Sequence, residues 1–173
     1  MPTRRIETIV RKLLEDQHVH APPIPVEEIA RNLGAQIRYS PFEGELSGMT
    51  FREKDRVVIG VNSLHHPNRQ RFTIGHEIGH MLLHKGTEIH IDRTFRVNLR
   101  DDVSSQAVDS EEIDANGFAA ELLMPRHMLL ADLQGQQIDF ENEEDLRPIA
   151  AKYRVSVQAL TFRLMNFGLI SPA

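Results

Sequence analysis

The apolar positions of the first third of the chain change their spacing once. In the first sixteen residues they recur at i, i+3, i+4, i+7 and i+8, at Ile6, Ile9, Val10, Leu13 and Leu14. One face of an α-helix carries this spacing, so the pattern predicts a helix that packs against a core. After a proline-rich connector, Val26–Leu33 predicts a second short helix, and Gly34 is placed to end it.

Beyond Gly34 the apolar positions alternate with polar ones, which predicts strands. The positions that define three short strands are Ile37 and Tyr39, then Met49 and Phe51, then Val57–Val61. Glycine, proline and polar turns separate these segments, and β-branched and aromatic residues are enriched within them. We expect a small antiparallel sheet.

Helical patterns return in the second half of the chain. Arg69–Leu83 and Glu111–Met124 predict two longer helices, and residues 126–173 predict two or three short ones. The intervening Lys85–Ser110 segment is long and polar, with one weak strand-like alternation, so we expect a functional or gating loop there. The order of elements predicts an α+β fold, with a domain over residues 1–125 and a C-terminal helical segment, 126–173, packed on it.

Composition narrows the classes of protein. The 173 residues are 40% apolar and 26% charged, which favours one packed core over disorder. A formal charge of -5 gives no global attraction to nucleic acid or to an anionic membrane. The absence of cysteine excludes disulfides, thiol nucleophiles and Cys-ligated zinc. No apolar stretch has the length of a signal peptide or membrane span, so we expect a cytoplasmic protein.

The strongest chemical motif is His76-Glu77-Ile78-Gly79-His80, of the form H-E-x-x-H, within the predicted helix. Residues at i and i+4 project from one face of a helix, so His76 and His80 are placed to bind one metal ion. Glu77 would lie beside that ion rather than on it, where a carboxylate can take a proton from water. The pattern therefore indicates a metal-assisted hydrolase.

Two glycines, Gly75 and Gly79, lie inside the same predicted helix. Each disfavours a helix interior by about 1 kcal/mol relative to alanine, which suggests that another backbone approaches closely there. A neighbouring strand or an extended substrate would be one reason, and tight helix–sheet packing without a ligand is the alternative.

A catalytic zinc needs a third protein ligand and an open position. His84 follows His80 by one turn, but it lies about 12 Å from His76 along the helix axis, too far to share one ion with it. We therefore interpret His84 as a contact around the site or as a half-exposed histidine.

Glu112 is the better candidate for the third ligand, because a carboxylate would complete a His2Glu site. Asn116, one turn later on the same face, could support a metal-bound histidine. Two alternatives stay open. Asp109-x-x-Glu112 also fits a helix capping box, and Glu111 is a second possible ligand.

Three segments taken together carry a family resemblance: RQRFTIGHEIGHMLLH at 69–84, VNLRD at 97–101 and EEIDANGFAAELLMP at 111–125. In this combination and order they resemble the ImmA/IrrE metallopeptidases. The resemblance spans most of the chain, since the order of the earlier elements also matches. One departure is Gly75, where the family more often has alanine.

The resemblance implies a zincin-like fold of the gluzincin type, with His76, His80 and Glu112 as metal ligands and Glu77 as general base. Zn²⁺, one per chain, is the default ion for such a ligand set, and Mn²⁺ or Fe²⁺ would accept similar ligands. The resemblance also implies a protein substrate, a helix-turn-helix repressor encoded nearby, whose cleavage releases genes of a mobile element or a stress response.

Two details of substrate handling are predicted from position alone. The strand at Val57–Val61 precedes the motif helix and could bind substrate as an added β-strand. A side chain should stabilise the oxyanion of the reaction, and the candidates are Tyr153, Arg100, His65 and His66.

Two other functions compete with a peptidase. Residues 145–160 follow the pattern of a helix-turn-helix, whose second helix would offer Gln158, Thr161 and Arg163 to DNA. Alternatively, the protein could sequester a repressor or toxin partner without cutting it. Against DNA binding, the segment is only moderately basic and the chain as a whole is acidic.

Overall fold

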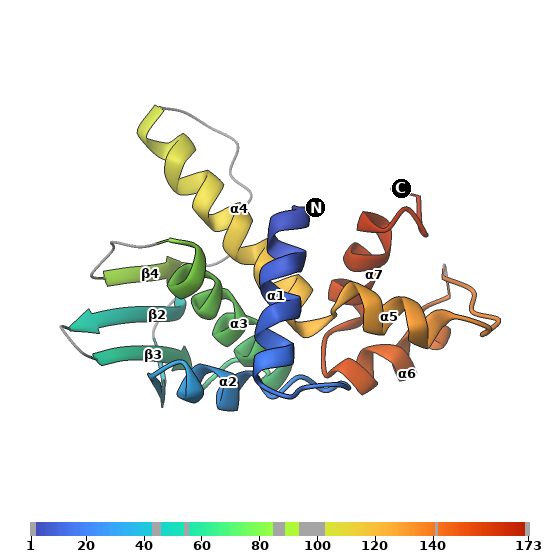
Figure 1. Ribbon diagram of the computed structural model, residues 1–173, viewed down its shortest axis with the longest axis horizontal. Helices are drawn as coiled ribbons and strands as arrows, with labels where there is room; N and C mark the ends of the chain where they lie inside the picture. Colours follow the sequence, from blue (N-terminus) through green and yellow to red (C-terminus); the bar gives the residue numbers. More distant parts are fainter. Residues whose placement is uncertain are drawn as a thin grey trace. The chain divides into compact units, whose positions relative to one another are not determined.

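The computed structural model describes residues 3–42, 46–53, 56–84, 89–93, 103–140 and 142–171. Their helices and strands (Figure 1) are, in chain order, α1 (Arg4–Asp16), α2 (Val26–Asn32), β1 (Ala35–Ser40), β2 (Leu46–Glu53), β3 (Arg56–Asn62), α3 (Pro67–Leu83), β4 (Ile89–Arg93), α4 (Val103–Leu123), α5 (Arg126–Leu133), α6 (Glu143–Tyr153) and α7 (Val157–Asn166). The predicted α+β class is confirmed. The chain divides into two compact units, one of Val26–Ala119 and one of Met1–Pro25 with Ala120–Ala173.

The sheet lies in the Val26–Ala119 unit and is mixed, not antiparallel as expected. Its strand order is β1-β3-β2-β4, with β1 parallel to β3 and the other neighbouring pairs antiparallel. Strand β3 thus lies between β1 and β2, the two strands that precede it in the chain. Because β3 is flanked on both sides, the prediction that Val57–Val61 takes up a substrate strand is wrong.

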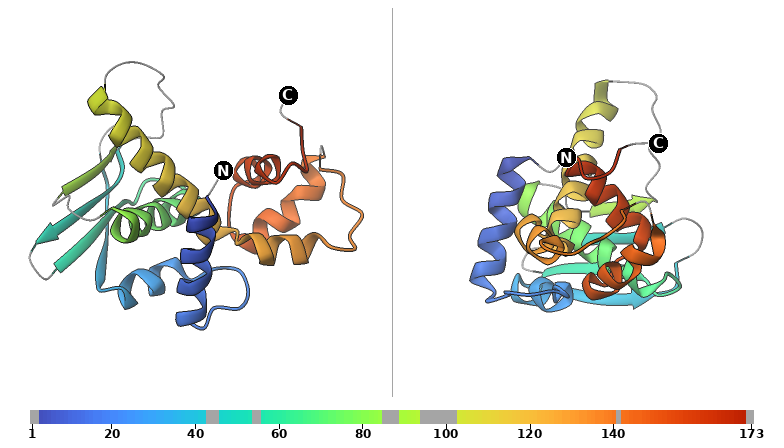
Figure 2. Two further views of the ribbon diagram at one scale, coloured as in Figure 1. Left: turned by 45° about the horizontal axis from the view of Figure 1, so that its top comes forward. Right: turned by 90° about the vertical axis from the view of Figure 1, so that its right-hand side faces the viewer.

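Helix α3 runs along one face of the sheet and is the centre of this unit (Figure 2). It begins earlier than predicted, because Pro67 occupies its first turn and the His66 ring accepts a hydrogen bond from the Asn68 N–H at 3.2 Å. All residues from Thr73 to His80 are buried. Such a helix has no solvent-facing side over two turns, so polar side chains within it need partners from neighbouring elements.

The two glycines of α3 face α4. A Cβ at position 79 would lie 3.1 Å from the Ala115 Cα and 3.2 Å from the Ala115 carbonyl oxygen, whereas one at position 75 would lie 3.5 Å from the Ala119 Cα. The expected close approach of a backbone is thus present. Its source is a helix rather than a strand or a substrate, since Gly75 and Gly79 pack one turn apart against Ala119 and Ala115.

The sequence predicts a loop over Lys85–Ser110, but part of this segment has regular secondary structure. It contains β4, which pairs with β2, and the first two turns of α4, which begins at Val103 rather than at Glu111. Backbone pairing with β2 turned a weak alternation into a strand. The remaining parts of the predicted gating loop, 85–88 and 94–102, lie outside the described residues.

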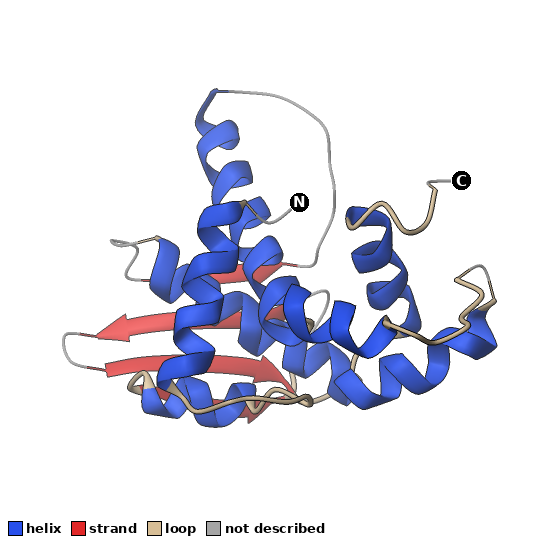
Figure 3. Ribbon diagram, turned by 45° about the vertical axis from the view of Figure 1, so that its right-hand side comes forward, coloured by secondary structure: helices blue, strands red, loops and turns tan. Residues whose placement is uncertain are grey.

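The other unit contains helices α1, α5, α6 and α7 and, among its described residues, no strand (Figure 3). Helix α1 buries Ile6, Val10, Leu13 and Leu14, as its spacing predicted. Helices α6 and α7 join through Arg154, which has a φ of 53°, and Ser156, whose hydroxyl accepts from the Ala159 N–H. The predicted helix-turn-helix shape is therefore present.

Of the three predicted DNA-reading side chains in the second helix of this shape, Gln158 is exposed and Thr161 is half-buried, but Arg163 is buried. Arg163 is 1% exposed and donates to the Glu121 carboxylate and to the Met124 carbonyl oxygen. Its guanidinium also lies 4.5 Å from the centre of the Phe167 ring. Since a buried, paired arginine cannot reach a base edge, the prediction that Arg163 faces a groove is wrong. No helix in the described ranges has the length and apolar character needed to cross a membrane.

Candidate metal centre

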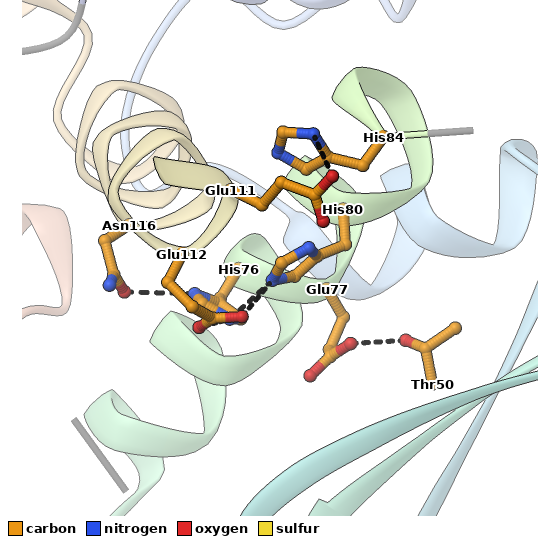
Figure 4. Close-up of polar contacts among 8 residues, drawn as sticks. All are labelled: Thr50, His76, Glu77, His80, His84, Glu111, Glu112 and Asn116. Carbon is orange, nitrogen blue, oxygen red and sulfur yellow. Dashed lines mark hydrogen bonds and ion pairs between the residues drawn. The ribbon is translucent and has the colours of Figure 1, made fainter. Parts of the chain in front are cut away.

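The imidazoles of the H-E-x-x-H motif meet on one face of α3. Their Nε2 atoms lie 3.0 Å apart, and both side chains are buried (Figure 4). Helical geometry alone accounts for this arrangement, because the two residues are one turn apart on a regular helix. The motif thus supplies two nitrogen donors that point to one position.

Helix α4 brings Glu112 to the same position. Its Oε2 lies 3.3 Å from His76 Nε2, and its Oε1 lies 3.2 Å from His80 Nε2. The capping-box alternative does not hold, because α4 starts at Val103 and places Asp109 and Glu112 inside the helix. Glu111 turns instead toward His84, with 3.8 Å between its Oε1 and the His84 Nδ1.

The three side chains fit a divalent metal. Within the described part of the chain, His76, His80 and Glu112 form a cluster in which each residue offers one ligand atom within 4.8 Å of the others. Two atoms bound about 2.0–2.1 Å from a tetrahedral zinc lie about 3.3 Å apart, close to the separations seen here. Two imidazoles and one carboxylate leave a fourth position for water or substrate, as in catalytic rather than structural sites.

Asn116 contacts His76 from one turn further along α4. Its Oδ1 lies 3.0 Å from the His76 Nδ1. An amide oxygen only accepts, so the His76 ring donates to it from Nδ1, and Nε2 is the nitrogen that could coordinate a metal. The contact that the sequence predicted for Asn116 is therefore present.

The charges of the cluster suit metal binding. Burial by itself raises the pKa of Glu112, but hydrogen bonds with His76 and His80 outweigh it and hold the pKa of this carboxyl well below its usual range. Burial lowers the pKa of His80 despite the opposing effect of Glu112. An ionised carboxylate and a neutral imidazole are the forms that coordinate a divalent cation.

Glu77 lies beside the cluster and is held from the sheet. Its side chain is completely buried, and its Oε2 accepts a hydrogen bond of 2.5 Å from the Thr50 hydroxyl on β2. The sequence analysis did not find Thr50. The signal for it was a polar residue between Met49 and Phe51. The apolar side chains mark the strand in the sequence, but the side chain that the fold buries is that of Thr50, at 2% exposure against 40% for Phe51.

Comparison with known families agrees with this geometry. Residues 30–165 match the model of the peptidase family M78, described as the IrrE N-terminal-like domain. The chain belongs to this family. The resemblance to ImmA/IrrE metallopeptidases is thereby confirmed. The cluster of His76, His80 and Glu112 is a group of side chains that could hold a metal ion.

Comparison with solved structures finds a protein of similar fold. A Mycobacterium tuberculosis transcriptional regulator is similar to this M78 chain with a TM-score of 0.60 and 12% identity, over 94% of this chain and 47% of that one. At this identity the likeness is one of fold alone. The chain spans about half the length of that regulator. No curated protein gives a significant match.

Two further predicted site residues of this M78 member, His84 and Tyr153, contact other partners. His84 packs its ring 5.4 Å from that of His80 and faces Glu111, so it contacts the surroundings of the site. Tyr153 is fully buried, and its hydroxyl donates to Asp132 Oδ2 at 2.7 Å. This contact does not support a role in oxyanion binding. Arg100 lies outside the described residues.

Proposed function

We propose that this protein is a zinc-dependent endopeptidase that cleaves a helix-turn-helix transcriptional repressor in the cytoplasm and so releases mobile-element or stress-response genes. The observation that carries the proposal is the convergence of His76, His80 and Glu112 beside a buried Glu77. Membership of the M78 family supports peptide-bond hydrolysis. The domain boundaries, 1–125 and 126–173, and a zincin-like arrangement are part of this proposal.

In the proposed reaction His76, His80 and Glu112 hold the metal. When bound, zinc would polarise the scissile carbonyl and lower the pKa of a water molecule to about 7. Glu77 takes the proton from the attacking water and delivers it to the nitrogen of the leaving amine. Asn116 keeps the proton of His76 on Nδ1, so that Nε2 stays available as a ligand.

The sheet suggests where a polypeptide substrate would lie. Strand β4 is at the end of the strand order and next to β2, which carries Thr50 against Glu77. An extended peptide that pairs with the outer edge of β4 would lie two strand positions from β2, about 9.6 Å across the sheet at about 4.8 Å per strand. Main-chain pairing at an edge accepts many sequences, so specificity would come from other contacts with the repressor.

The competing functions have less support. DNA binding through α7 loses Arg163, which is buried with Glu121. Sequestration without cleavage needs neither a buried carboxylate beside the histidines nor Asn116 on His76. A metal site would serve only stability in such a protein.

The experiment that tests the proposal compares the zinc-loaded protein with its Glu77→Gln variant. The first probe is a library of internally quenched peptides, and the second is the helix-turn-helix repressor encoded beside the gene, with new N-termini identified by mass spectrometry. We expect one cleavage site in the repressor and a loss of about 10²–10⁴-fold in rate for the variant at unchanged zinc content. Equal rates for both proteins, or no cleavage of either probe, would contradict the proposal.

A further inference from the structure

The contact between Thr50 and Glu77 has features that packing alone does not require. Both side chains are buried, Glu77 at 0% and Thr50 at 2% exposure, and the oxygens are 2.5 Å apart. A hydroxyl that donates to a carboxylate oxygen at this distance makes a direct hydrogen bond and not only a packing contact. The bond crosses from the sheet to α3 and thus joins Glu77 to an element other than its own helix (Figure 4).

Strand β2 is shaped to make this contact. Gly48 precedes Thr50 by two residues and so lies on the same face of the strand. A Cβ at position 48 would lie 2.3 Å from the Thr73 Cγ2 and 3.5 Å from Glu77 Oε1. The glycine therefore lets β2 approach α3 closely enough for the next inward side chain to reach the carboxylate.

The pairing of the sheet holds Thr50 in place. Thr50 pairs with Ile59 of β3 on one side and with His90 of β4 on the other, so its strand is enclosed between two neighbours. Its β-branched side chain has few rotamers available in such a setting. A glutamate, in contrast, has three rotatable bonds, and its carboxylate plane needs an external contact to be fixed.

We propose that Thr50 is a positioning residue for Glu77: its hydroxyl, presented by β2 next to Gly48, fixes the orientation of the carboxylate that moves the proton. The inference rests on the proposed peptidase function. The proposed effect of Thr50 is to orient the Glu77 carboxylate. Such an effect can be large, because a misplacement of about 1 Å at a reacting group can reduce the rate about 10²-fold. Thr50 touches none of the three residues that would hold the metal in the contacts described above.

The test uses two substitutions at Thr50 and one matched control. Thr50→Val keeps the shape of the side chain but removes the donor, and Thr50→Ser keeps the hydroxyl. Thr161→Val makes the same chemical change at a threonine whose hydroxyl donates to the Val157 carbonyl oxygen at 3.0 Å in α7. Three quantities are measured on each protein: zinc affinity, kcat and KM on the quenched peptide library, and the proton NMR signal of the Thr50 hydroxyl in the metal-free protein.

We expect Thr50→Val to lower kcat at least about tenfold with KM and zinc affinity changed less than about threefold, and Thr50→Ser to recover most of the loss. The hydroxyl signal should be present in the wild type, absent in Thr50→Val, shifted in Glu77→Gln and unchanged in Thr161→Val. Wild-type kcat in Thr50→Val would overturn the inference. A loss of zinc affinity that parallels the loss of rate would also overturn it, because Thr50 would then act on the metal centre.

Failure of the proposed function has a different signature. If the zinc-loaded wild type cleaves no peptide but the hydroxyl signal shifts in Glu77→Gln, the peptidase assignment is wrong and Thr50 still holds the carboxylate. If the Thr50 hydroxyl signal is missing in the wild type, or if Glu77→Gln does not shift it, the contact between Thr50 and Glu77 does not exist in solution.

Discussion

Glu111 and Glu112 are neighbours on α4 with opposite surroundings. Glu112 faces His76 and His80, while Glu111 is 48% exposed and lies 3.8 Å from His84. The sequence favoured Glu112, which completes a His2Glu site with Asn116 one turn later, and kept Glu111 as an alternative. A helix turns by about 100° per residue, so only one of two neighbours can face a given point. The position of α4 relative to α3 decided between them.

This difference gives a matched pair of substitutions. We expect Glu112→Gln to weaken zinc binding by more than about 100-fold, since loss of a metal ligand should exceed the about 10–100-fold effect of losing a residue that only supports one. Glu111→Gln should change the affinity less than about threefold. Competition with a coloured chelator measures both constants. Equal effects of the two substitutions would contradict the assigned ligand set.

At the scale of elements, the packing of α3 on α4 determines the site. Gly79 and Ala115 bring the two backbones together, and this contact places Glu112 and Asn116 opposite the histidines. The sequence indicated a close approach at the glycines, but it could not name the partner. A glycine shows that there is no side chain at its position, but it does not show which neighbouring element occupies the space.

Gly75 and Gly79 should therefore respond differently to alanine. Gly75→Ala adds a methyl group at ordinary contact distance and removes a flexible residue from a helix, so we expect a free energy of unfolding that is unchanged or up to about 1 kcal/mol higher. Gly79→Ala inserts its methyl 3.1 Å from a backbone carbon and should lower that free energy by about 1–3 kcal/mol. Urea unfolding measures both. Zinc affinity should fall only in Gly79→Ala, where α4 must shift.

A second pair of helices is joined through Asp132. Its Oδ1 lies 2.6 Å from the Lys152 Nζ, and its Oδ2 accepts from the Tyr153 hydroxyl, so α5 and α6 are linked. Burial acts to raise the pKa of Asp132, but the bonds from Lys152 and Tyr153 outweigh it and lower the pKa. The folded protein thus binds a proton at this position less readily than the unfolded chain does.

The sign of the pH dependence follows from this shift. A carboxyl with a depressed pKa in the folded state stabilises the protein above its unfolded pKa, and the stabilisation is lost as pH falls through the folded pKa. We expect Asp132→Asn to lower the melting temperature by a constant amount above about pH 5 and by less at more acidic pH. Calorimetry from pH 7 to pH 3 gives the result. A difference that widens toward low pH would refute the link.

At the scale of the whole molecule, the family match covers residues 30–165 and so includes parts of both compact units. Helix α4 also contributes residues to both, with Glu112 in one and Glu121 in the other. Because Glu112 lies on a helix that contributes to both units, we expect metal binding to change the unfolding temperature of the chain.

We expect zinc to raise the stability of the wild type, because a ligand that binds only the folded state stabilises it by about 2.7 kcal/mol at 100 times its Kd. Thermal unfolding with zinc, with magnesium and with a chelator measures the effect. Magnesium should have little influence, since it prefers oxygen ligands. Glu112→Gln should show a much smaller zinc effect, and an equal effect in both proteins would place the zinc elsewhere.

The sequence by itself determined most local features of this protein: the helices apart from the start of α4, the strands β1, β2 and β3, the two histidines one turn apart and the candidate carboxylates. These follow from periodicities that a short segment carries. Only the tertiary structure decided that β3 lies between β1 and β2, that α4 packs on the glycines of α3, and that Thr50 reaches Glu77. The reason is physical. Thr50 and Glu77 are 27 positions apart, and His76 and Asn116 are 40 apart. No local pattern specifies which distant surface will fill the space beside a glycine or a buried carboxylate.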